Sequence, residues 1–175
     1  TSYILDITAK LFFGGQDILR TKEGLEKVLL KAAELKKQVI LWYKEEGQFQ
    51  QALQSGEVPA GQYYHNVTLQ AAADGFPVRS TFPKEGGVID FGCWAIIEGS
   101  KKVPEAEEFI NWCCQPSVQA LMVRHVGTAP VVPQSMTDLT DAEFAKVSSP
   151  IKPIVPLFNV YVEHGDFISE RWSAL

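Results

Sequence analysis

An amphipathic helix followed at once by a short apolar run is the feature that most limits what this chain can fold into. Within residues 22–36, apolar side chains recur at helical spacing and Lys and Glu occupy the opposite face. The next segment, residues 38–43, reads Gln-Val-Ile-Leu-Trp-Tyr and lacks polar alternation, which is typical of a strand buried on both faces. A helix and a buried strand in succession predict layers of helix and sheet.

The same alternation continues along the first hundred residues. The patterns predict further helices at residues 2–13, 47–55 and 67–73, and further strands at residues 59–64, 78–82 and 88–97. After residue 97 the patterns are mainly helical, at residues 104–114, 116–126, 137–147 and 166–175. The expected fold class is therefore α/β, with a second, helix-rich packing unit toward the C-terminus.

Charge and composition exclude several classes of function. The chain has 16 Lys+Arg against 21 Asp+Glu, a net charge of -5, so it offers no broad basic face and nucleic acid is not expected as a partner. No apolar run is long enough to span a bilayer, and Thr1 to Leu5 lack the pattern of a signal peptide. The sequence contains no metalloprotease HExxH, no hydrolase GxSxG, no phosphate-binding glycine loop and no paired CxxC, so we expect no catalytic, cofactor or metal site.

Two places could hold a ligand. Tyr63 and Tyr64 lie where a predicted strand ends and a helix starts, the edge at which open α/β sheets gather ligands. The alternative is that one tyrosine packs in the core and the other anchors the loop. Asp90, Gly92 and Trp94 share one face of the predicted strand 88–97. That face is either a solvent-facing edge or a cleft wall that recognises a cation.

Several segments, taken in order, resemble the spermidine/putrescine-type extracellular solute-binding proteins of ABC transporters. The similarity rests on Lys-Glu-Gly-Gly at 84–87, Phe-Ile-Asn at 109–111, Gln-Pro-Ser-Val at 115–118 and Gly-Thr-Ala-Pro at 127–130, and it runs from Tyr3 to Leu175. The resemblance implies a periplasmic binding protein of type 2, with two lobes and a strand crossover. It also implies that the N-terminal part of such a protein, with its signal peptide, is missing from this chain.

The same resemblance implies a division of the chain and a location. Residues 1–87 are expected to form mostly the second, inserted α/β lobe, residues 88–97 the strand that crosses between lobes, and residues 98–175 a helix-rich return to the first lobe. The implied protein is not an enzyme. It is periplasmic, or extracellular and membrane-associated in a Gram-positive host, and its partners are a small cationic or polar solute and the ABC permease subunits.

Carried over residue by residue, the family's polyamine site falls on four positions. The family has an aromatic residue at Tyr64, a tryptophan at Asp90, an acid at Gly92 and a tyrosine near Thr128, and only Tyr64 keeps its character. The acid stands two residues earlier on the same predicted strand face, where Asp90 could still meet an amine. The expected ligand residues are Tyr63, Tyr64, Asp90, Gly92, Trp94 and Thr128.

Two other functions remain open at this point. Iron-binding relatives use adjacent tyrosines near this position, and phenolate oxygens suit Fe(III), so Tyr63 and Tyr64 could serve a ferric-iron-binding periplasmic protein. A fragment of a cytosolic α/β enzyme is the third alternative, with Cys93 or Cys114 as nucleophile.

Overall fold

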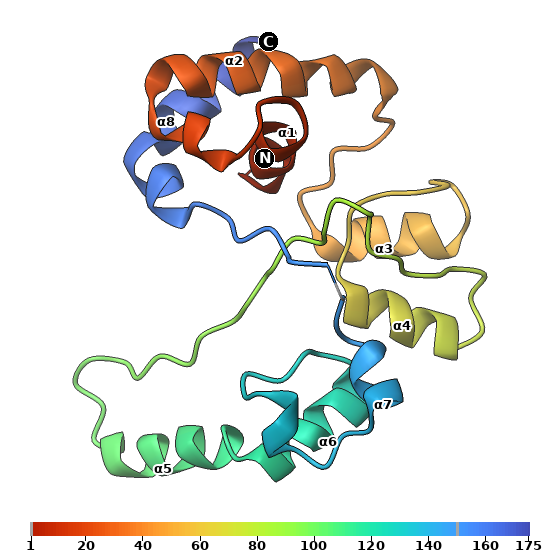
Figure 1. Ribbon diagram of the computed structural model, residues 1–175, viewed down its shortest axis with the longest axis vertical. Helices are drawn as coiled ribbons and strands as arrows, with labels where there is room; N and C mark the ends of the chain where they lie inside the picture. Colours follow the sequence, from red (N-terminus) through yellow and green to blue (C-terminus); the bar gives the residue numbers. More distant parts are fainter. Residues whose placement is uncertain (1, 150) are drawn as a thin grey trace. The chain divides into compact units, whose positions relative to one another are not determined.

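The computed structural model describes residues 2–149 and 151–175, so Thr1 and Pro150 lie outside the description. The described residues form α-helices and short 3-10 helices joined by loops (Figure 1). In chain order the elements are α1 (Ser2–Phe12), η1 (Gln16–Arg20), α2 (Lys22–Ala33), η2 (Glu34–Gln38), α3 (Glu46–Gln54), α4 (His65–Ala73), α5 (Val103–Cys113), α6 (Pro116–Val126), η3 (Gln134–Met136), α7 (Asp141–Ala145) and α8 (Phe158–Ala174). None of the described helices is both long and apolar enough to cross a membrane.

The chain divides into two compact units, each assembled from separate stretches of sequence. Unit 1 contains the described residues of Thr1–Lys44, Pro83–Asp90 and Ile151–Leu175, and unit 2 contains those of Glu45–Phe82 and Phe91–Pro150. These bounds differ from the lobes expected at residues 1–87 and 98–175, whose assignment remains a prediction.

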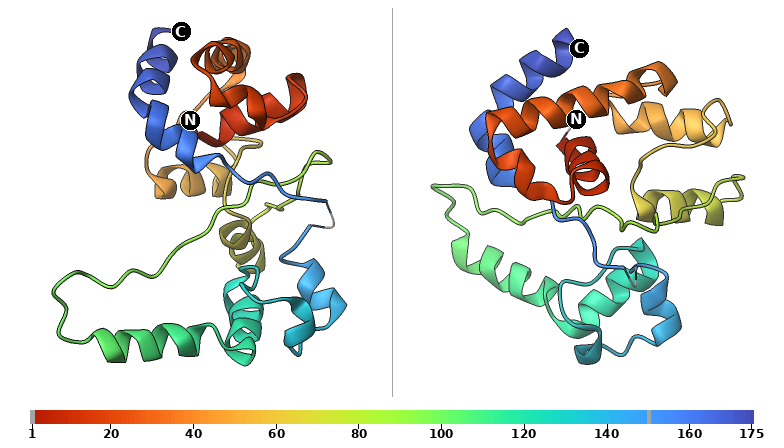
Figure 2. Two further views of the ribbon diagram at one scale, coloured as in Figure 1. Left: turned by 60° about the vertical axis from the view of Figure 1, so that its left-hand side comes forward. Right: turned by 45° about the horizontal axis from the view of Figure 1, so that its top comes forward.

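Unit 1 is built around α2, which packs against α1, η1 and α8 (Figure 2). Its buried core consists of Leu5, Ala9, Leu19, Leu25, Val28, Leu29, Ala32, Val160 and Ile168. The Thr21 side chain accepts a hydrogen bond from the Gly24 backbone N–H at 3.1 Å, which caps α2 at the predicted boundary. A Cβ at Gly24 would lie 1.8 Å from the Ile18 carbonyl oxygen, so only glycine permits η1 to approach α2 this closely.

The last helix starts earlier than the sequence indicates. The pattern predicts a helix from Asp166, whereas α8 begins at Phe158 and contains a kink at His164, where φ is -118° and ψ is 16°. Gly165 follows the kink, and a glycine at this place weakens the helical pattern in the sequence. The extra two turns matter because they carry Val160 into the core of unit 1.

Unit 2 contains α3 to α7, and its buried cluster joins α6 to α7. The cluster consists of Ala120, Val123, Leu139 and Val147, with Phe144 packed against it. The helix boundaries follow ordinary capping chemistry. Pro116 opens α6, Gly127 closes it in the left-handed conformation at φ 76°, and a capping box of Thr140 and Glu143 starts α7. Tyr64 is the N-cap residue of α4.

The described residues contain no strand, so they do not confirm the predicted layers of helix and sheet. The four segments predicted as strands are loops, apart from Gln38 at the end of η2 and an isolated bridge at Val88, because they lack the neighbouring strands that a hydrogen-bonded ladder requires. Their apolar side chains are also not all buried: Ile40 is 75% exposed and Ile97 is 82% exposed. Figure 2 shows the chain between residue 90 and α5 as an extended stretch.

One short pairing remains within unit 1. Val88 and Ile154 form an isolated parallel bridge, in which the Ile89 N–H donates to the Ile154 carbonyl at 2.9 Å and the Ile154 N–H donates to the Gly87 carbonyl at 2.8 Å. Lys10 of α1 donates to the Glu85 carbonyl at 2.7 Å and holds the same segment to α1. The bridge therefore attaches two loops of unit 1 to each other and to its helices.

Candidate functional site

The clearest constellation of aromatic and charged groups lies in unit 2, where α3 meets the start of α4. The Tyr64 hydroxyl donates to Oε1 of Glu46 at 3.0 Å, and the Tyr63 hydroxyl donates to the Glu46 backbone carbonyl at 3.0 Å. The two tyrosine rings have centroids 5.5 Å apart, and the ring of Phe49 lies 5.1 Å from that of Tyr63. We call Glu46, Phe49, Tyr63 and Tyr64 the tyrosine–glutamate cluster.

The cluster has a rigid base and an open side. Phe49 is buried, and a Cβ at Gly61 would lie 2.3 Å from its ring, so the ring packs directly against the Gly61 backbone. Tyr63 and Tyr64 are half-buried, and Glu46 is exposed. The exposed carboxylate of Glu46 therefore lies beside the rings of Tyr63 and Tyr64, and the Tyr63 ring packs on the buried Phe49.

The surroundings of Tyr63 make its phenol harder to ionise. Burial, and after it the negative charge of Glu46, raises the pKa of the Tyr63 hydroxyl above its ordinary value of 10.0. A ferric site would need phenolate ligands, and no group of three or more His, Cys, Asp or Glu among the described residues is placed to hold a metal ion. The donor set does not favour iron.

Asp90 lies in unit 1, where it interacts with α1. The Tyr3 hydroxyl hydrogen-bonds to the Asp90 carboxylate. Burial, followed by this hydrogen bond and the charge of Asp90, raises the pKa of Tyr3 to about 12. Asp90 is exposed and keeps a carboxylate surface in contact with solvent.

The remaining predicted ligand residues lie in unit 2. Gly92 and Trp94 are exposed in the extended stretch before α5, which is not a strand, so the shared strand face proposed for them with Asp90 is not formed. The Trp94 ring packs edge-on against Phe109 of α5, with centroids 5.4 Å apart. Thr128 is half-buried and directly follows Gly127, the cap of α6.

Glu46 is the residue of the cluster that the sequence does not single out. It stands next to Glu45 at the start of a short helix, and such acidic pairs usually form a solvated helix face. Its partner Tyr64 is 18 residues further along the chain. The sequence shows an acid in the first turn of a predicted helix, but it does not show that this acid accepts a hydrogen bond from Tyr64.

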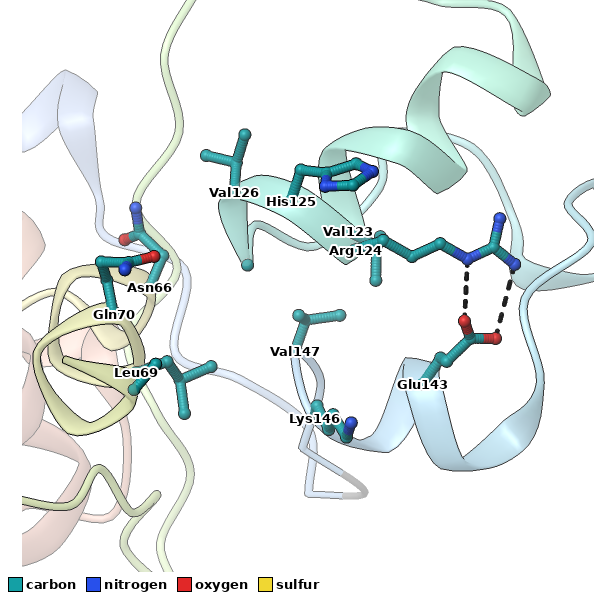
Figure 3. Close-up of a pocket in the computed structure, with 12 residues that line it drawn as sticks. Asn66, Leu69, Gln70, Val123, Arg124, His125, Val126, Glu143, Lys146 and Val147 are labelled. Atoms are coloured by element: carbon teal, nitrogen blue, oxygen red, sulfur yellow. Dashed lines mark hydrogen bonds and ion pairs between the residues drawn. The ribbon is translucent and has the colours of Figure 1, made fainter. Parts of the chain in front are cut away.

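A separate hollow of about 400 Å³ lies in unit 2 between α4, α6 and α7 (Figure 3). Its apolar wall includes Leu69, Val123 and Val147. On its other side Arg124 binds Glu143 at 2.7 Å, and hydrogen bonding to Arg124 is the main reason that the pKa of Glu143 falls to about 2. Arg124 and Glu143 thus pair with each other on this side of the hollow, and the surface that lines the hollow is mainly apolar.

Comparison with known proteins identifies the family of this sequence. A family model described as bacterial extracellular solute-binding protein matches residues 5–147, which is most of the chain. The chain belongs to this family. A curated relative, the gamma-aminobutyric acid-binding protein of Pseudomonas aeruginosa, is 25% identical over 164 residues. The alignment covers 90% of this chain and 45% of the relative, so the chain spans less than half of the relative's length. No solved structure matches the chain.

Family membership fits a binding role better than a catalytic one. The alternative of a cytosolic enzyme fragment depends on Cys93 or Cys114 as nucleophile, and both thiols are exposed. A reactive thiol needs a neighbouring base or positive charge that lowers its pKa.

Proposed function

We propose that the chain is part of the solute-binding component of an ABC importer, and that its solute is a small molecule bearing a primary ammonium group. The full protein would have the periplasmic binding fold of type 2 and would close two lobes over the solute. It would then deliver the closed form to permease subunits in the membrane. Its site of action is the periplasm, or the outer side of the membrane in a Gram-positive host, and it carries out no chemical conversion.

The tyrosine–glutamate cluster is the observation that carries this proposal. A carboxylate supplies the charge and the hydrogen-bond acceptors that an ammonium group needs, and neighbouring aromatic faces attract a cation. A carboxylate has room for about four hydrogen bonds, so the bond from Tyr64 leaves Glu46 acceptor capacity for the solute. Asp90, which belongs to unit 1, is a separate candidate carboxylate and is not counted as part of this cluster.

The relatives support an ammonium group without naming one solute. The Pseudomonas relative is named for gamma-aminobutyric acid, which has one ammonium group and one carboxylate. The spermidine/putrescine type, which the motifs of this sequence resemble, is named for solutes with two or more ammonium groups and no carboxylate. The feature common to both is a primary ammonium on a flexible aliphatic chain, and this feature defines the proposed solute class.

Thermal unfolding of the intact protein with a panel of solutes tests the proposal. Putrescine, spermidine and gamma-aminobutyric acid form the ammonium arm, and glucose, succinate and ferric citrate form the other. A solute at 100 times its Kd stabilises the folded state by about 2.7 kcal/mol, which raises the midpoint by several degrees. We expect a shift within the ammonium arm, and the responding member separates a polyamine site from an amino-acid site.

A matched pair of variants assigns the shift to the cluster. Glu46→Gln should abolish the shift and leave the midpoint of the free protein nearly unchanged, because Glu46 is exposed. Glu45→Gln changes the neighbouring exposed acid and should keep the shift. A panel in which no ammonium compound stabilises the protein would refute the proposal. A response to ferric citrate alone, with a phenolate absorption band lost in Tyr64→Phe, would assign the protein to iron.

A further inference from the structure

A single histidine joins three segments of unit 2 directly beside the tyrosine–glutamate cluster. His65 is the first residue of α4, and its half-buried ring contacts the segment that leads out of α4 and the end of α7. Its Nδ1 lies 2.7 Å from the Ser80 hydroxyl oxygen, and its Nε2 lies 2.6 Å from the Lys146 carbonyl oxygen. The ring also packs on Phe82, with centroids 4.7 Å apart and planes tilted by 36°.

The partners of the ring select the tautomer of the neutral imidazole. A carbonyl oxygen can only accept, so Nε2 must carry a hydrogen and donate it to Lys146. In the neutral ring Nδ1 is then the acceptor, and the Ser80 hydroxyl donates to it. Both ring nitrogens are thereby satisfied, which holds the imidazole in one orientation.

The contacts of His65 hold the first turn of α4, which follows directly after Tyr64. The Tyr64 carbonyl accepts hydrogen bonds from the Thr68 N–H at 3.1 Å and from the Thr68 hydroxyl at 2.9 Å, so the first turn of α4 fixes the Tyr64 backbone. No side-chain hydrogen bond caps this helix at Tyr64. The start of α4 is instead held by the next residue, His65, whose side chain hydrogen-bonds to Ser80 and Lys146 outside the helix.

We infer that His65 is a positioning residue for solute binding: its bonds to Ser80 and Lys146 hold the first turn of α4 and keep the Tyr64 hydroxyl on Glu46. This inference rests on the proposed function. It adds a residue that makes no contact with the solute and still sets the affinity. The alternative role for the same contacts is purely structural, in which case they stabilise unit 2 without affecting a folded site.

Four variants of the intact protein separate the two roles. His65→Ala removes both hydrogen bonds, His65→Gln retains an amide N–H that can reach the Lys146 carbonyl, and Ser80→Ala removes only the bond at Nδ1. His125→Ala is the control, because His125 is an exposed histidine on α6 of the same unit. Each variant is studied at least 15 degrees below its own unfolding midpoint, a margin chosen so that the protein is folded.

The first measurement needs no solute. Amide hydrogen exchange at Thr68 reports whether the first turn of α4 is held, because this N–H donates to the Tyr64 carbonyl. We expect about tenfold faster exchange in His65→Ala, a smaller increase in His65→Gln and Ser80→Ala, and no change in His125→Ala. Unchanged exchange at Thr68 in His65→Ala would overturn the inference whether or not a solute is known.

The second measurement is the Kd of the ammonium compound that responds in the thermal panel, by calorimetric titration. We expect an affinity about tenfold weaker in His65→Ala and partly restored in His65→Gln, with His125→Ala equal to the natural protein. A lower unfolding midpoint with an unchanged Kd would overturn the positioning role and leave the proposed function intact. If no ammonium compound binds the natural protein, the proposed function fails, and with it the inference about solute affinity.

Discussion

Tyr161 of α8 donates its hydroxyl hydrogen to the carboxylate of Asp6 on α1, and Asp6 has no surface exposed to solvent. The same carboxylate accepts from the Gln16 side-chain amide and from the Leu157 N–H, the latter at 3.3 Å. Burial, and then the bond to Asp6, raises the pKa of Tyr161 above its ordinary range. One buried acid therefore connects α1, η1 and the start of α8 at the centre of unit 1.

Replacing this acid should destabilise unit 1 more than replacing its tyrosine partner. Asp6→Ala removes the shared acceptor of the hydrogen bonds from Gln16, Leu157 and Tyr161, and we expect a loss of about 2–4 kcal/mol in the free energy of unfolding. Tyr161→Phe removes one hydroxyl and should cost about 1 kcal/mol. Urea unfolding measures both values. Equal losses in the two variants would show that Asp6 does not organise the other donors.

At high pH the protein should lose stability through Tyr3. Folding raises the pKa of Tyr3 from 10.0 to about 12, so the folded state favours the neutral phenol. The resulting stabilisation is complete below pH 10 and is lost as the pH rises through 12. Urea midpoints measured from pH 9 to 12 should fall, and Tyr3→Phe should reduce the fall. An identical pH profile in the two proteins would contradict a raised pKa at this residue.

At low pH unit 2 should lose stability through Glu143. Its pKa falls from 4.5 to about 2, chiefly through the hydrogen bond from Arg124, so its stabilising effect is present above pH 4.5 and disappears as the pH falls through 2. Glu143→Gln should make acid unfolding less steep. Glu108→Gln, an exposed acid on α5, is the control for a general change of charge. The prediction is wrong if both variants change the acid transition equally.

A pair of glycines tests the close approach of two loops in unit 1. Gly86 is buried with φ at +106°, and a Cβ there would lie 2.7 Å from the Lys152 carbonyl oxygen. Gly86→Ala should therefore cost about 1–3 kcal/mol and disturb the adjacent bridge between Val88 and Ile154. At Gly92 an added Cβ has no atom within 4 Å, so Gly92→Ala should be nearly neutral. Thermal unfolding of the two variants gives the comparison.

Helices were predictable from local pattern, and the core positions of α2 show why. Leu25, Val28, Leu29 and Ala32 recur at helical spacing, and all four are buried in the core of unit 1. The strand predictions failed because an apolar run such as 38–43 specifies only that its side chains could be buried. A strand also needs a partner at the correct register, and the described chain supplies one only around Val88.

The candidate site shows the same division between local and distant information. Tyr63 and Tyr64 could be selected because two aromatic residues precede a helix, which is a local signal. Glu46 and the partners of His65 could not, because their contacts join residues 15 to 81 positions apart in the sequence. Asp6 gives no signal either, since a single acid in an amphipathic helix is usually solvated.

The discontinuous composition of unit 1 has a consequence for synthesis on the ribosome. Its core needs α1 and α2 from the first segment together with Val160 and Ile168 from the last. Leu25 and Leu29 of α2 therefore remain incompletely covered during synthesis until the segment after residue 150 has been translated. Unit 2, whose residues end before Ile151, is free to fold in the meantime. During synthesis unit 1 is thus the unit whose core is completed last.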